Sequence, residues 1–121
     1  MLDPALANEE FCYLTTAGRV TGQPRTVEIW FGMKGNTVYM LAGGGEKAHW
    51  VRNLRRHPAV SVRIRGKEYA GEARVLAEGG KEARARALLY YKYSGGYSGD
   101  LENWRRTALP VAVDLAAGAE E

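Results

Sequence analysis

The chain has 121 residues, 45% of them hydrophobic, so it can bury one modest core, and we expect a single domain over residues 1–115 followed by a frayed tail, 116–121. The single cysteine excludes a disulfide framework, and no Cys/His group has zinc-ligand spacing, so no metal site is expected. The net charge is +3 and arginine outnumbers lysine, which suits phosphate and carboxylate ligands, whereas the scattered arginines do not predict a nucleic-acid partner.

Turn signals divide the chain into short segments. Asp3 and Pro4 fit the cap and first residue of a lead-in helix that ends at Glu10. Alternating or short apolar runs predict strands at 11–16, 25–31, 37–41, 60–64, 69–75 and 109–115. Further helices are expected between Lys47 and Pro58, over 81–92 and over 101–106, with a loop at 93–100. About six strands in hairpin order with two or three helices predict an α+β domain built on a small antiparallel barrel.

The segment from Val38 to Pro58 shows the clearest change of pattern. A short apolar run ends in Gly43, Gly44 and Gly45, and helical spacing of apolar residues follows. Glycines permit positive φ and leave backbone amides uncovered, and a helix start adds unpaired N–H groups and a positive dipole next to Lys47. These features are typical of an anion site, although a flexible turn with a solvated lysine would have the same sequence.

Two motifs support a family resemblance. Gly18-Arg19-Val20-Thr21-Gly22-Gln23-Pro24-Arg25, followed by Lys47-x-x-Trp50-x-x-Asn53-Leu54-x-x-x-Pro58, resembles the deazaflavin-dependent nitroreductase and quinone reductase family over about residues 11–115. The resemblance implies a split β-barrel related to the flavin-binding pyridoxamine phosphate oxidases, a homodimer, and coenzyme F-420 or, in some branches, FMN, haem or a bilin. Val20 and Gly43-Gly44 stand where many members carry a lysine and a Ser-Lys pair.

The resemblance also suggests site residues. The expected cofactor-binding residues are Arg19, Arg25, Thr26, Val27, Leu41, Ala42, Gly43, Gly44, Gly45, Lys47 and Trp50. The arginines could clamp a phosphate or a carboxylate, or could simply keep a hairpin soluble. Trp50 lies on an apolar helix face, where an aromatic side chain more often belongs to the core. Tyr93 and Tyr97 lie in glycine-rich sequence and are the candidate catalytic residues, because a loop there could close over a bound ring and a hydroxyl could protonate an acceptor.

These features lead to two main functional hypotheses. The first is an oxidoreductase that transfers hydride from a reduced deazaflavin or flavin to a quinone or nitro-type acceptor, for which no nucleophile is needed because the cofactor supplies the chemistry. The second is a non-catalytic carrier of FMN, haem or bilin on the same barrel, suggested by the two missing basic positions. No signal peptide or membrane-length apolar run is present, so a cytoplasmic protein is expected.

Overall fold

A computed structural model describes residues 3–76, 80–94 and 101–116. All seven strands belong to one antiparallel sheet, in the order β2-β1-β5-β6-β7-β4-β3. The strands are β1 (Phe11–Ala17), β2 (Pro24–Trp30), β3 (Gly32–Lys34), β4 (Thr37–Ala42), β5 (Ala59–Ile64), β6 (Lys67–Val75) and β7 (Leu109–Leu115). The α-helices are α1 (His49–Arg56), α2 (Gly80–Tyr93) and α3 (Leu101–Thr107), with short 3-10 helices η1 (Pro4–Asn8) and η2 (Gly45–Lys47).

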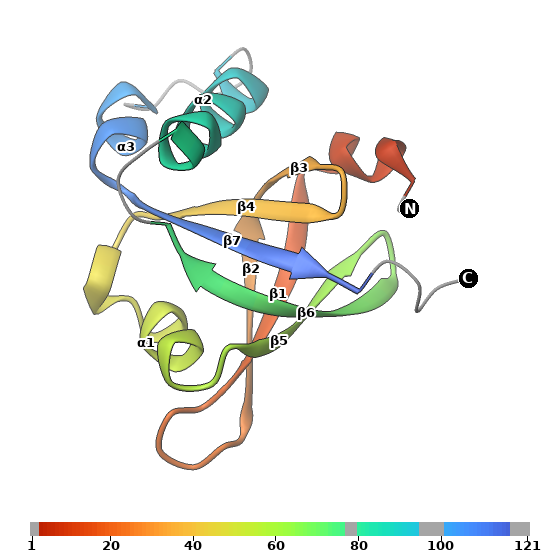
Figure 1. The fold of residues 1–121 in the computed structure, drawn as a ribbon, viewed down its shortest axis with the longest axis vertical. Helices are drawn as coiled ribbons and strands as arrows, with labels where there is room; N and C mark the ends of the chain where they lie inside the picture. Colours follow the sequence, from red (N-terminus) through yellow and green to blue (C-terminus); the bar gives the residue numbers. More distant parts are fainter. Residues whose placement is uncertain (1–2, 77–79, 95–100, 117–121) are drawn as a thin grey trace.

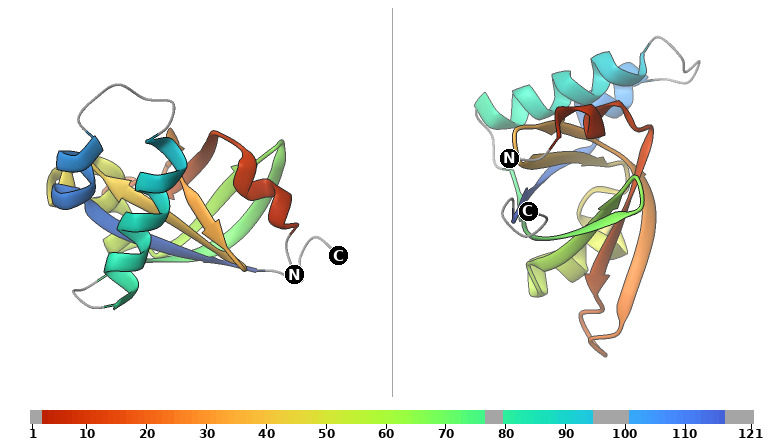
Figure 2. Two further views of the ribbon diagram at one scale, coloured as in Figure 1. Left: turned by 90° about the horizontal axis from the view of Figure 1, so that it is seen from above. Right: turned by 90° about the vertical axis from the view of Figure 1, so that its right-hand side faces the viewer.

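The sheet curls into a barrel-like body, with α2 and α3 together on one side and α1 on another (Figures 1 and 2). Alternation along the strands turns one face inward, and the core side chains inside have no exposed surface: Leu14, Val38, Met40, Val62, Val111 and Val113. A second apolar cluster, which includes Leu41, Leu89 and Tyr93, lies where α2 and α3 cover β4. The expected α+β antiparallel split barrel is therefore confirmed.

The sheet has seven strands where the sequence predicted six, because the long strand expected at 25–31 is followed by a separate short strand, β3. The chain leaves the pairing of β2 with β1 at Trp30 and resumes pairing with β4 at Gly32. Phe31 lies between the two strands and is fully buried, so its backbone groups need partners. Two consecutive residues of α2 supply them. Lys92 Nζ donates to Phe31 O at 2.8 Å, and Phe31 N donates to Tyr93 Oη at 3.0 Å.

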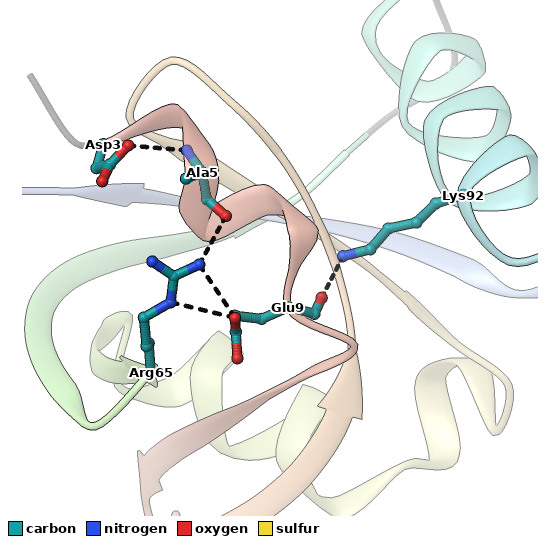
Figure 3. A network of polar contacts seen from close by, with 5 residues as sticks. All are labelled: Asp3, Ala5, Glu9, Arg65 and Lys92. Carbon is teal, nitrogen blue, oxygen red and sulfur yellow. Dashed lines mark hydrogen bonds and ion pairs between the residues drawn. The ribbon is translucent and has the colours of Figure 1, made fainter.

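The short N-terminal helix is held by side chains from distant parts of the chain (Figure 3). Asp3 caps it by accepting a hydrogen bond from Ala5 N at 2.9 Å. Arg65, in the turn between β5 and β6, donates to the Ala5 carbonyl and to the Glu9 carboxylate, each at 3.1 Å, while Lys92 Nζ donates to Glu9 O at 2.7 Å. The helix ends at Asn8, before the Glu10 expected from the sequence.

Candidate functional site

A pocket of about 450 Å³ lies between the tip of the β1–β2 hairpin and helix α1, within the size range of small-molecule sites. The residues that line it are Gly18, Arg19, Val20, Thr21, Arg25, Val27, His49, Trp50 and Asn53. Both motifs quoted from the sequence contribute to this lining. The pocket therefore brings together residues that lie about thirty positions apart in the chain.

The hairpin tip has a defined conformation of its own. Gly18 N donates to Gln23 O and Gly22 N donates to Gly18 O, both at 2.8 Å. Gly22 has a φ of +78°, which a residue with a Cβ adopts only at a cost. The register places Ala17 opposite Pro24, so the tip projects directly from the end of the β1–β2 ladder toward α1. This geometry carries Arg19 to the helix.

Asn53, on α1, joins the helix to the hairpin. Its Oδ1 accepts from Arg19 N at 3.1 Å and from Arg19 Nη1 at 2.9 Å, and its Nδ2 donates to Thr16 Oγ1 at 3.2 Å. Asn53 is 4% exposed and Thr16 is 1% exposed, so these bonds are sheltered from water. Arg19 Nη2 also lies 3.2 Å from His49 Nδ1. Because a guanidinium can only donate, Nδ1 is the acceptor in this contact.

The chemistry of the lining suits an anionic ligand with an apolar part. Arg19 and Arg25 are cationic, no acidic residue lines the pocket, and no carboxylate among the described residues pairs with either arginine. Val27 and Trp50 are partly buried and pack against the core, so they offer apolar surface that the scaffold holds in place. A phosphate or carboxylate beside the arginines and a flat ring beside the apolar side chains would both find matching groups here.

Several residues predicted from the sequence lie elsewhere. Thr26 points to the opposite sheet face, where its hydroxyl lies 2.7 Å from that of Thr15. Leu41 and Ala42 are buried in the core. Gly43, Gly44 and Lys47 are exposed, and none of the three glycines lines the pocket.

The helix expected between Lys47 and Pro58 is present as α1, although it does not begin directly at Lys47. The α-helix begins at His49, and the extended residue Ala48 separates it from the 3-10 helix Gly45–Lys47, which contains the third glycine. Of the three glycines, only Gly45 has a positive φ, +59°.

The sequence predicted a loop that begins at Tyr93, but helix α2 extends to this residue. Its side chain is 7% exposed and its ring stacks on Trp30 at 4.1 Å between centroids. Its hydroxyl donates to Glu10 O at 2.7 Å, with Phe31 O at 3.0 Å, and accepts from Phe31 N. Burial raises the pKa of this hydroxyl. Tyr93 therefore packs the core and holds the β2–β3 junction, and we do not retain it as a catalytic candidate. Tyr97 lies outside the described residues.

Sequence reasoning missed Thr21 at the hairpin tip and two polar residues of α1 that line the pocket, His49 and Asn53. The spacing i, i+4 places both on one side of α1, and a buried asparagine among apolar helix positions is the signal that could have identified the second. Among the described residues no group of three or more His, Cys, Asp and Glu side chains could hold a metal ion, and no helix in that part of the chain is long and apolar enough to cross a membrane.

Solved structures share this fold. A protein described as an F420-H2-dependent reductase (FDR-A) is 25% identical, with a TM-score of 0.70 over 87% of this chain and 93% of that chain. A chain described as a domain-swapped dimer is 24% identical, with a TM-score of 0.70 over 87% and 79%. HutZ, the haem storage protein of Vibrio cholerae, is 13% identical, with a TM-score of 0.72 over 91% and 84%. The last two are similar in fold alone.

A family model gives the functional assignment. The model for F420H(2)-dependent quinone reductase matches residues 4–116, which is nearly the whole chain. This match confirms the resemblance seen in the two motifs and favours an enzyme over a cofactor carrier. The chain therefore belongs to the F420H(2)-dependent quinone reductase family and is an oxidoreductase that uses coenzyme F-420.

Proposed function

We propose that the pocket between the hairpin tip and α1 binds the cofactor, with Arg19 and Arg25 contacting its phosphate or glutamate carboxylates, and that the enzyme reduces a quinone. The observation that supports this placement is the pairing of two cationic side chains with apolar Val27 and Trp50 in a pocket that has no acidic residue. Nitro compounds are a second acceptor class, since both classes accept a hydride and a proton.

When bound, the reduced deazaflavin supplies a hydride, and the protein's residues do the rest. Arg19 and Arg25 bind the anionic groups by charge-assisted hydrogen bonds, which are the stronger kind. Val27 and Trp50 exclude water from one side of the pocket. The Tyr93 hydroxyl is already engaged with backbone groups, which leaves Tyr97 or solvent to supply the proton that completes reduction of the acceptor.

Affinity measurements on Arg25 test the placement. Arg25 is exposed, so a charge-assisted bond from it should contribute about 0.5–1.5 kcal/mol. Arg25→Gln should therefore raise the Kd for F-420 about three- to tenfold, with less effect at high salt, because exposed charges are screened. Arg63→Gln is the matched control, since Arg63 is exposed and lies over the Tyr13 ring, outside the pocket. Equal Kd values for Arg25→Gln and wild type would refute the placement.

The same titration distinguishes the two cofactors, and turnover assays distinguish the two acceptor classes. FMN should bind the wild type more weakly than F-420, and FMN that binds equally well and supports turnover would contradict the proposal. Steady-state assays with menadione and with a nitroaromatic compound then rank the acceptors. A higher kcat/KM for the nitro compound would overturn the quinone assignment.

We also propose that the protein is a homodimer. One structure of similar fold is described as a domain-swapped dimer, and a chain of 121 residues has little surface with which to enclose a ring system. Light scattering at micromolar concentration should give twice the mass of 13.3 kDa. A monomer that binds F-420 tightly would contradict the proposal.

A further inference from the structure

We infer that Asn53 is a positioning residue of the pocket, whose side-chain amide fixes the guanidinium of Arg19 for an incoming anion. The inference rests on the function proposed above, because it assumes that Arg19 contacts the cofactor. Asn53 lies on α1 and Arg19 in the hairpin tip, 34 positions away. A single oxygen, Asn53 Oδ1, accepts from both the backbone N and the Nη1 of Arg19, so it holds the arginine at both ends of its side chain.

The surroundings of Asn53 determine the orientation of its amide. Oδ1 faces two N–H donors of Arg19, while Nδ2 faces the hydroxyl oxygen of Thr16. A 180° flip would turn the NH₂ group toward those two donors and lose both bonds. Asn53 and Thr16 are 4% and 1% exposed, so water could not replace the lost partners. The two N–H donors of Arg19 therefore keep Oδ1 directed at Arg19, and the buried Thr16 hydroxyl accepts from Nδ2.

The remaining donors of Arg19 are available to a ligand. Nη1 and Nη2 each carry two hydrogens, and the described contacts use one on Nη1 for Asn53 and one on Nη2 for His49. One hydrogen on each of these two nitrogens and the hydrogen on Nε take part in none of the described contacts, so three N–H donors remain for a phosphate or carboxylate. Because the long side chain is already held, less rotamer entropy is lost when the anion binds.

The side chain of Asn53 acts on the hairpin and not on its own helix. The helix end uses the backbone carbonyl of Asn53, which accepts from His57 N at 2.8 Å and would persist in any side-chain variant. The three side-chain hydrogen bonds go to Arg19 and Thr16, both in the β1–β2 hairpin. Removal of the amide should therefore release Arg19 while the helix keeps its end.

A double-mutant cycle tests this role. Wild type, Asn53→Ala, Arg19→Gln and the double variant are titrated with F-420 by fluorescence, and thermal unfolding is measured for each. Asn53→Ala should raise the Kd about fivefold when Arg19 is present and less than twofold in the Arg19→Gln background. Equal losses in both backgrounds would show that Asn53 only supports the fold and would overturn the inference. Asn8→Ala, in the exposed part of η1, is the control and should leave the Kd unchanged.

A second variant covers the case in which Asn53→Ala does not fold. Asn53→Asp is isosteric, keeps an acceptor toward Arg19, and lets the Thr16 hydroxyl donate to the second oxygen. Its negative carboxylate, however, pairs with the guanidinium and offsets the positive charge that would attract the anion. It should keep the unfolding temperature near that of wild type, raise the Kd by about fivefold or more, and weaken its salt dependence; an unchanged Kd would overturn the inference. If Arg19→Gln alone leaves the Kd for F-420 unchanged, both this inference and the proposed cofactor contact fail. If Arg19→Gln raises the Kd but the effect of Asn53→Ala is the same with and without Arg19, only the inference is contradicted.

Discussion

Substituting Tyr93 by Phe separates a structural role from a catalytic one. The change deletes the hydroxyl that accepts from Phe31 N at 3.0 Å and donates to Glu10 O at 2.7 Å, while the ring that stacks on Trp30 remains. Phe31 is fully buried, so its N–H loses its partner without access to water. An unsatisfied buried donor costs about 1–3 kcal/mol, whereas the carbonyl of exposed Glu10 can recover a bond from solvent. We therefore expect the free energy of unfolding to fall by about 2 kcal/mol.

For a domain of this length, about 2 kcal/mol corresponds to a Tm lowered by roughly 8 °C. Circular dichroism during heating measures the shift, and turnover of menadione at 15 °C should stay within about twofold of wild type, since the hydroxyl lies in the core. Tyr91→Phe is the matched control on the same helix, because Tyr91 is 72% exposed, and it should change neither quantity. A Tyr93→Phe protein of unchanged Tm but much reduced kcat would refute the structural assignment and return the residue to the catalytic site.

Three further predictions concern stability and reactivity. Burial lowers the pKa of Lys92 to about 8, so above that pH the unfolded chain binds more protons than the folded protein. The free energy of unfolding of the wild type should therefore rise by about 1 kcal/mol between pH 7 and 9. Denaturant titrations of Lys92→Met should lack this rise. Gly71→Ala should lose about 1–3 kcal/mol by thermal unfolding, because the added Cβ would lie 2.7 Å from Val113 Cγ1, whereas Gly43→Ala, with 3.9 Å to its nearest neighbour, should be neutral. Burial raises the pKa of Cys12 to about 12, so iodoacetamide should label the thiol only in denaturant; fast labelling of the native protein would contradict its burial.

The local patterns of the sequence were enough for most of the secondary structure. The alternation along 60–64 and 69–75 predicted two strands, and both appear as β5 and β6 in one hairpin. The two motifs that resemble the reductase family also predicted Arg19, Arg25, Val27 and Trp50, which the structure gathers in one pocket. Such predictions succeed because side-chain periodicity and turn chemistry act between near neighbours in the chain.

The features that sequence reasoning missed depend on contacts between distant residues. The sequence near Phe31 does not show that pairing passes there from β1 to β4, because the groups that bind its buried backbone are Lys92 and Tyr93, more than sixty positions later. The glycine run could be recognised as a turn, but the extended Ala48 and the late start of α1 placed it away from the pocket. Asn53 acquires its role only when the hairpin tip brings the donors of Arg19 to its amide oxygen. The sequence by itself determined most of the helices and strands and the kind of ligand. The tertiary structure decided which polar groups meet, because a hydrogen bond of about 3 Å requires both partners to be placed by the packing of separate elements.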